Sequence, residues 1–151
     1  MKMAMRGSLI AILAGSGLSA FSQEANWTTD YGKAVGQARR ENKPILLDFT
    51  GSDWCEWCIK MKKETLDTQT FKDYADKNLV LMEVDFPMNK PQPDAVKAQN
   101  QDLSQKYQVE GFPTFLLVSK TGKLLWQHEG YLPGGAAAFV AEVKNHSRGA
   151  E

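Results

Sequence analysis

The hydrophobic pattern of residues 28–146 predicts alternating helices and strands. Apolar residues recur at helical spacing in four segments, 28–43, 55–74, 95–109 and 134–146. Two short apolar runs, 45–51 and 78–86, are typical of buried strands. Residues 111–130 read as two strands joined at Lys120–Gly122, which is a hairpin signal. The prolines of residues 87–95 indicate a surface loop.

The predicted order of elements is α, β, α, β, α, β, β, α. Strands separated by helices pair in parallel through crossovers, whereas the last two strands are antiparallel neighbours. This order predicts an α/β fold with a central mixed β-sheet and helices on both faces.

Composition and charge exclude several classes of protein. The chain has 151 residues, 42% of them apolar and 24% charged, which suits one globular domain with a sizeable core. Eighteen basic and eighteen acidic side chains cancel. No excess of charge therefore directs the chain to nucleic acid or to anionic lipid.

The N-terminal segment predicts export. Lys2 and Arg6 precede an apolar run, and small residues follow up to Ser22. This is the layout of a secretory signal peptide, and the apolar run is shorter than the roughly 20 residues that span a bilayer. We expect a signal peptide at 1–22, cleaved after Ser22, and a domain at 23–151 in the periplasm or outside the cell. A retained membrane anchor is the alternative.

The two cysteines of the chain, Cys55 and Cys58, lie in the hexapeptide DWCEWC. Outside the cytoplasm, paired thiols usually form structural disulfides. A structural disulfide acts mainly by closing a long loop of the unfolded chain, and this spacing closes almost none. The spacing therefore favours reversible redox chemistry.

The C-x-x-C pair follows a predicted strand and begins a predicted helix. Amide N–H groups of the first helical turn and the helix dipole both stabilise negative charge there, which lowers the pKa of Cys55. Only a thiolate attacks a disulfide, so Cys55 is the predicted nucleophile. Cys58, one turn further along, would then resolve the mixed disulfide.

Two segments resemble the thioredoxin family: ILLDFTGSDWCEWCIKM, with a strand, active-site turn and helix, and EGFPTFLLVSKTGK, with a proline and hairpin. The resemblance covers about residues 27–146 and implies a thioredoxin fold. It also implies that Pro113 is cis and packs beside Cys55, leaving the backbone of Phe112 to bind an extended substrate. Taken alone, Pro113 reads equally well as an ordinary turn proline.

The resemblance further implies that Asp48, in an otherwise apolar strand, accepts the proton of Cys58. A buried carboxylate there would have a raised pKa. This chain departs from the family, because one extra residue separates Asp48 from Cys55 and Leu81 takes the position of the lysine that pairs with that aspartate. An aspartate that bonds the local turn is the alternative.

The remaining residues of the hexapeptide adjust the predicted site. A carboxylate at Glu56 should raise the pKa of Cys55, which favours a reducing protein, unless solvent screens it. Trp54 should shield the site and offer a flat contact surface. Trp57 should be exposed for protein docking, or it is an ordinary surface aromatic.

Other functional classes fit the chain less well. A zinc site needs four ligands, and His128 and His146 lie far apart in a strand and a helix end, so each is expected to be a surface histidine. A peroxidase usually has a pocket of proline, threonine and cysteine for the peroxide, and the segment TGSDWC does not match it. Serine hydrolase, P-loop and dinucleotide fingerprints are absent from the sequence.

We therefore predict a thiol–disulfide oxidoreductase that reduces disulfides of exported client proteins and acts as a monomer. The sulfurs carry the electrons, so no cofactor or metal is expected. A membrane thiol protein would supply the electrons. The alternatives are a disulfide oxidase or isomerase that uses the same pair, and a redox-inert binding module.

Overall fold

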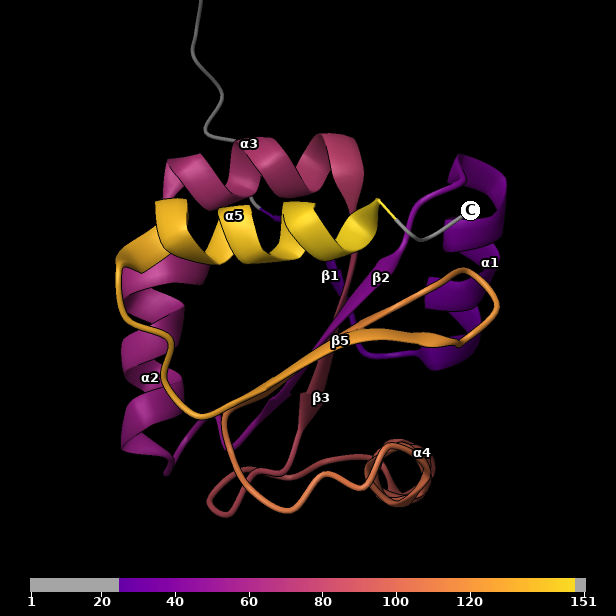
Figure 1. Cartoon of the computed structure of the whole chain (residues 1–151). Coiled ribbons are helices and arrows are strands. Elements are labelled where there is room, and N and C mark those ends of the chain that lie inside the picture. The colour runs from indigo at the N-terminus through magenta and orange to yellow at the C-terminus, as the bar shows by residue number, and fades with distance from the viewer. Residues whose placement is uncertain (1–24, 149–151) are drawn as a thin grey trace, which may run out of the picture.

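The computed structural model describes residues 25–148. Five strands form one sheet in the order β1-β3-β2-β4-β5 (Figure 1). They are β1 (Trp27–Thr28), β2 (Ile45–Thr50), β3 (Val80–Asp85), β4 (Thr114–Val118) and β5 (Leu124–Glu129). Strand β3 runs parallel to β1 and β2, whereas β4 is antiparallel to both β2 and β5. The predicted mixed sheet is thus confirmed.

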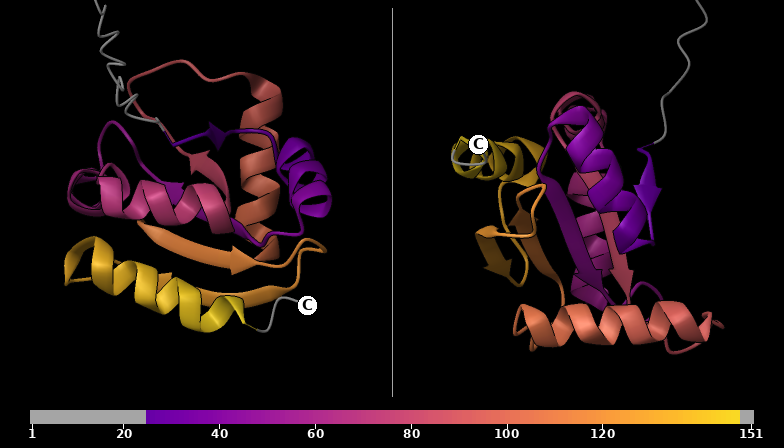
Figure 2. Two further views of the ribbon diagram at one scale, coloured as in Figure 1. Left: turned by 90° about the horizontal axis from the view of Figure 1, so that it is seen from above. Right: turned by 90° about the vertical axis from the view of Figure 1, so that its right-hand side faces the viewer.

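Helices cover both faces of this sheet (Figure 2). They are α1 (Tyr31–Glu41), α2 (Glu56–Met61), the π-helix η1 (Lys62–Leu66), α3 (Gln69–Asn78), α4 (Asp94–Lys106) and α5 (Gly135–Ser147). Helices α1 and α4 pack on one face, and α2, η1, α3 and α5 pack on the other. Helices α3 and α5 lie side by side in both figures.

The second predicted helix, 55–74, is three elements rather than one. Helix α2 passes into the π-turn η1, which ends at Leu66. Thr68 then has extended backbone, and its hydroxyl accepts a hydrogen bond from the N–H of Phe71, so a new helix begins there. The apolar pattern continues less regularly across this interruption, and the sequence analysis interpreted 55–74 as a single helix.

Strand β1 was not predicted. It has two residues, too few to show alternation, and it forms by pairing with Leu81 and Met82 of β3. It lies at the edge of the sheet. This strand exists only through its pairing with β3, which its own residues do not indicate.

The interior divides into two apolar clusters, one on each face of the sheet. The cluster beneath α1 and α4 contains side chains from β2, β3 and β4: Ile45, Leu47, Phe49, Val80, Met82, Val84, Leu116 and Val118. The cluster beneath α2, η1, α3 and α5 is centred on Leu46, Leu81, Phe115, Phe71 and Phe139. Each such side chain, once buried, stabilises the fold by about 1.5–3 kcal/mol.

Within residues 25–148, no helix is both long and apolar enough to cross a membrane. The predicted signal peptide, 1–22, lies outside the described residues.

Candidate active site

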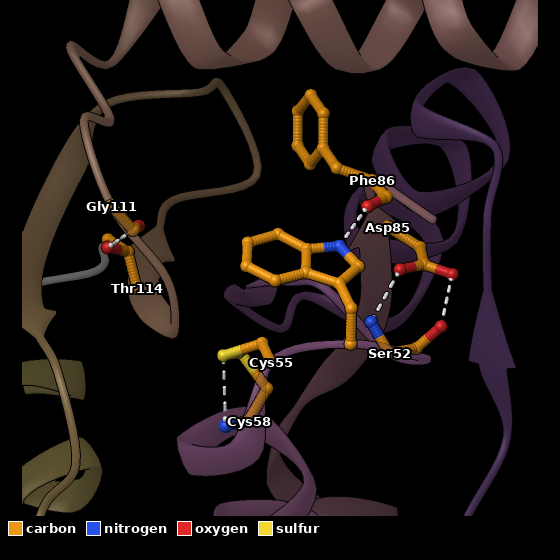
Figure 3. The surroundings of a disulfide bond; sticks show 8 residues. Ser52, Cys55, Cys58, Asp85, Phe86, Gly111 and Thr114 are labelled. Carbon is orange, nitrogen blue, oxygen red and sulfur yellow. Dashed lines mark hydrogen bonds between the residues drawn. A yellow bond between two sulfur atoms is a disulfide. The ribbon is translucent and has the colours of Figure 1, made fainter. Parts of the chain in front are cut away.

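Cys55 and Cys58 form a disulfide at the start of α2 (Figure 3). Cys55 is the N-cap of the helix, and its Sγ accepts a hydrogen bond of 3.2 Å from the N–H of Cys58. The pair lies at the predicted junction of strand and helix. Cys55 is 7% exposed and Cys58 is 5% exposed, so only a small part of each residue is open to solvent.

The turn that leads into α2 is tied to the end of β3. Asp85 accepts hydrogen bonds from the N–H and the hydroxyl of Ser52, at 3.0 and 2.6 Å (Figure 3). The carboxylate of Asp53 accepts the N–H groups of Met88 and Asn89, at 3.0 and 2.7 Å, and these bonds lower the pKa of Asp53. Polar contacts thus position the turn, although the sequence offered no sign of their partners.

The side chain of Trp54, the residue before Cys55, is held by a hydrogen bond and by ring contacts. Its indole N–H donates to the carbonyl of Phe86 at 2.8 Å. The indole also meets the ring of Phe112 edge-on, with 6.0 Å between centroids, and Phe112 stacks on Phe86 at 5.0 Å. Trp54 is 41% exposed, which agrees with the predicted contact surface.

The peptide bond between Phe112 and Pro113 is cis, as predicted. Two hydrogen bonds hold this loop. The hydroxyl of Thr114 donates to the carbonyl of Gly111 at 2.7 Å (Figure 3), and the N–H of Gly130 donates to the carbonyl of Pro113 at 2.7 Å. The loop is therefore held in place by its own strand and by the end of β5.

A small apolar groove joins this loop to α2. It is lined by Trp57, Phe112, Pro113, Gly130 and Tyr131 and has a volume of about 270 Å³. Trp57 is 53% exposed, as expected, and its ring lies 5.5 Å from that of Tyr131. The groove therefore brings together three predicted residues and two that were not predicted.

Tyr131 is the main residue of the groove that sequence reasoning missed. Its hydroxyl donates to the carboxylate of Glu64 at 2.6 Å. The ammonium of Lys60 lies over the rings of both Trp57 and Tyr131, at 5.2 and 4.8 Å. These contacts hold the rings of Trp57 and Tyr131 together along one side of the groove. The sequence did not indicate them, because Tyr131 is far along the chain from Trp57.

Asp48 is buried in β2 and is 7% exposed. Its Oδ1 is buried without a hydrogen-bond partner. The pKa of Asp48 is raised to about 8, chiefly by burial and then by the nearby charge of Glu83. This is the direction that the sequence predicted.

The expected neighbour of Asp48 was wrong. Leu81 is paired with Leu46 and is buried in the apolar cluster, whereas Glu83 is the register partner of Asp48. Alternation along β3 places Leu81 two residues before Glu83 on the same face. Without the register, the sequence could not distinguish the two positions. A second acid, rather than an aliphatic residue, therefore faces Asp48.

The rings of both histidines stack with Trp126, with centroids 5.9 Å (His128) and 5.8 Å (His146) from it. His146 is exposed, as expected, but His128 is only partly exposed and its Nε2 is buried without a partner. Within residues 25–148, no group of three or more histidine, cysteine or acidic side chains is arranged to hold a metal ion.

The thioredoxin-like domain model matches residues 31–145. The chain belongs to this family. It is 44% identical over 115 residues to the disulfide bond reductase DsbH of Chlamydia pneumoniae, covering 76% of this chain and 69% of that protein. A solved structure of a DsbH oxidoreductase is 40% identical and superposes with a TM-score of 0.79, covering 83% of this chain and 86% of that one.

A further relative is the thiol:disulfide interchange protein DsbD of Actinobacillus pleuropneumoniae. It is 31% identical over 87 residues, which are 58% of this chain but 13% of that protein. The comparisons confirm the predicted family and fold class. Together with the Cys55–Cys58 pair, they support the predicted role as a thiol–disulfide oxidoreductase.

Proposed function

We propose that this chain reduces disulfide bonds of exported client proteins. The observation that supports this most directly is the disulfide at the start of α2, next to an apolar groove lined by Trp57 and the cis-proline loop. The similarity to a disulfide bond reductase favours reduction over the reverse reaction.

In the reduced protein, the thiolate of Cys55 attacks one sulfur of the client disulfide. The N–H of Cys58 points at the sulfur of Cys55, and the dipole of the helix adds to its effect. Both favour the anionic form of Cys55. The attack forms a mixed disulfide and releases the first client sulfur as a thiolate, which takes up a proton.

Cys58 completes the reaction. Its thiol loses a proton, for which Asp48 is the proposed acceptor, and the resulting thiolate attacks the sulfur of Cys55. The bond between Cys55 and the client breaks, and the second client sulfur leaves as a thiolate. Two electrons have then passed from the protein to the client, and the Cys55–Cys58 disulfide is restored.

The groove positions the client for this exchange. Among residues 25–148, no backbone group bonds to the N–H or the carbonyl of Phe112, so both are available to an extended segment of a client. Trp54 and Trp57, each one residue before a cysteine, offer exposed apolar surface. Pro113 lines the groove together with Trp57.

The wider setting follows from the chemistry. The sulfurs carry the electrons, so the reaction needs no further cofactor. An exported reductase must be reduced again from across the membrane, and we propose a membrane thiol protein as the donor, with residues 1–22 acting as the export signal. All proposed groups lie in one domain, which allows the protein to act as a monomer.

The reduction potential tests the proposed direction. The protein is equilibrated with glutathione or dithiothreitol, and the fraction of disulfide is followed. We expect a reducing potential, in the range of thioredoxin, near −270 mV. A potential near that of strong periplasmic oxidants, about −120 mV, would instead support the oxidase, which uses the same sulfurs.

Trapping of clients tests the proposed nucleophile. In Cys58→Ser, the mixed disulfide on Cys55 should persist, so client proteins should remain attached until a reductant is added. Cys55→Ser, with Cys58 intact, is the matched control and should trap little, because Cys58 lacks the N-cap position and the N–H bond that stabilise a thiolate on Cys55. Stronger trapping by Cys55→Ser would reverse the assigned roles, equal trapping would remove the distinction between them, and no trapping would support an inert binding module.

A further inference from the structure

Three acidic residues share one face of the sheet at the end nearest the disulfide. Asp48 of β2 and Glu83 of β3 are register partners. Two residues further along the strands, Asp85 is the register partner of Thr50. Alternation along the strands places all three on the face covered by α2 and η1. The opposite face has only apolar residues at these strand positions.

The three acids differ in their partners. Asp85 is 5% exposed and accepts hydrogen bonds from Ser52, and Lys90 lies 3.1 Å from its Oδ2. Asp48 is equally buried, but its Oδ1 has no partner. Glu83 is partly exposed. The buried, unpartnered carboxyl therefore faces a carboxyl that reaches toward solvent.

Two lysines also act on this pair. Lys62 of η1 lowers the pKa of both Asp48 and Glu83, and Lys90 lowers that of Glu83. Each lysine has another close acidic partner, because Lys62 lies 2.9 Å from Asp67 and Lys90 pairs with Asp85. Neither lysine therefore neutralises Asp48 directly.

The same lysine connects the pair to the resolving cysteine. The N–H of Lys62 donates to the carbonyl of Cys58, so the two residues are one helical turn apart. Side chains four residues apart lie on one side of a helix. Asp48 lies on the sheet face that α2 and η1 cover, and α2 carries Cys58, so the buried carboxyl and the resolving cysteine share one side of the sheet.

We propose that Glu83 is a positioning residue of the resolving step: as the register partner of Asp48, it sets through its charge the pH at which Asp48 can take the proton of Cys58. The proposal rests on the reductase function above. The transfer itself is simple. The proton leaves the Cys58 sulfur and joins the Asp48 carboxylate, and no other bond to Asp48 changes.

Electrostatics agree with the geometry. Burial raises the pKa of Glu83, and the charge of Asp85 acts in the same direction. An ionised Glu83 disfavours the ionised form of Asp48, as a like charge at a shared site does. Removing that charge should make Asp48 a competent base at lower pH.

The test is the pH–rate profile for reduction of a disulfide-bonded model peptide by the reduced protein. In Glu83→Gln, we expect the midpoint assigned to Asp48 to move about one unit to lower pH. Glu83→Asp, which keeps the charge, should restore the original midpoint. Glu41→Gln removes an exposed carboxylate at the end of α1 and should leave the profile unchanged.

A double variant shows whether Glu83 acts through Asp48. Asp48→Asn alone should abolish the midpoint, and adding Glu83→Gln should then produce no further shift. An unchanged profile in Glu83→Gln would overturn the proposal. The proposal would also be overturned if Glu83→Gln shifted the pH–rate profile equally when Asp48 is already replaced by Asn, because Glu83 would then act on a cysteine directly.

An infrared titration of the Asp48 carboxyl separates this proposal from the reductase function, because it needs no turnover. If the protein fails to reduce peptides but its Asp48 titration moves in Glu83→Gln, the coupling between Glu83 and Asp48 stands and the reductase role is overturned. If the protein reduces peptides normally but its Asp48 titration does not move in Glu83→Gln, only the proposed role of Glu83 is overturned.

Discussion

The two faces of the central sheet are built from the same strands but differ in chemistry. On the face beneath α1 and α4, β2 and β3 present only apolar side chains along their length. On the opposite face, both strands begin with leucine, Leu46 and Leu81, and continue into the acids Asp48, Glu83 and Asp85. The disulfide lies beyond this acidic end.

The difference shows how one small domain separates stability from reactivity. The apolar face contributes burial without functional constraint. The other face contributes burial at one end and accepts the cost of an unpartnered carboxyl at the other, since an unpaired buried polar group is unfavourable. Substitutions on the two faces should therefore have effects of different kinds.

The largest effect is expected from Phe49→Ala on the apolar face. Phe49 is fully buried, and removal of such a ring costs about 3–5 kcal/mol through lost burial and the cavity left behind. Urea unfolding measures this loss. Ile59→Ala, at a site 49% exposed on α2, is the control and should change stability by less than about 1 kcal/mol. A loss below 1 kcal/mol in Phe49→Ala would contradict the comparison.

Asp48→Asn should change how stability depends on pH. The folded protein holds the Asp48 proton up to about pH 8, whereas an ordinary aspartate ionises near 3.8. Between these values the folded state binds more protons, so the free energy of unfolding falls as pH rises and levels off above 8. At about 1.4 kcal/mol per pKa unit, the fall amounts to a few kcal/mol.

Urea unfolding at pH 5 and pH 8 measures this difference. Asp48→Asn should remove most of the fall, while the part contributed by Glu83 remains. Asp94→Asn, at a fully exposed carboxylate of α4, should keep the original dependence. A fall of the same size in Asp48→Asn would show that Asp48 is ionised in the folded protein at neutral pH.

Gly51→Ala tests how tightly the reactive end is packed. A Cβ at Gly51 would overlap the indole of Trp54, so the ring must move and lose its hydrogen bond to Phe86. Such overpacking costs about 1–3 kcal/mol. Urea unfolding and tryptophan fluorescence should both report it. Gly111→Ala, where a Cβ meets open space, should leave stability and fluorescence nearly unchanged. If Gly51→Ala had as small an effect as Gly111→Ala, the turn would be loosely packed.

Lys62→Met should have the smallest effect, opposite in sign to that of Glu83→Gln. Lys62 lowers the pKa of Asp48, so its removal should move the pH–rate midpoint slightly upward. The shift is small because half of this lysine side chain is exposed and solvent screens its charge. Lys63→Met, at the adjacent exposed position, should leave the midpoint in place. A downward shift in Lys62→Met would be inconsistent with this arrangement of charges.

Local patterns were sufficient for most of the fold. The apolar runs that became β2 and β3 and the hairpin of β4 and β5 were predicted from short segments of sequence. The Cys55–Cys58 pair and the cis Pro113 were identified because each belongs to a local motif. The break at Thr68 was missed because the less regular apolar pattern beyond Leu66 was interpreted as more of the same helix, and β1 was missed because two residues cannot show a period.

The sequence alone determined the order of elements, the reactive pair and the family, since each depends on neighbours along the chain. Only the tertiary structure decided that Glu83 rather than Leu81 faces Asp48, and that Tyr131 completes the groove. Those contacts join residues far apart in the chain. A strand register or a loop position that is off by one or two residues changes which side chains meet, and no local spacing records it.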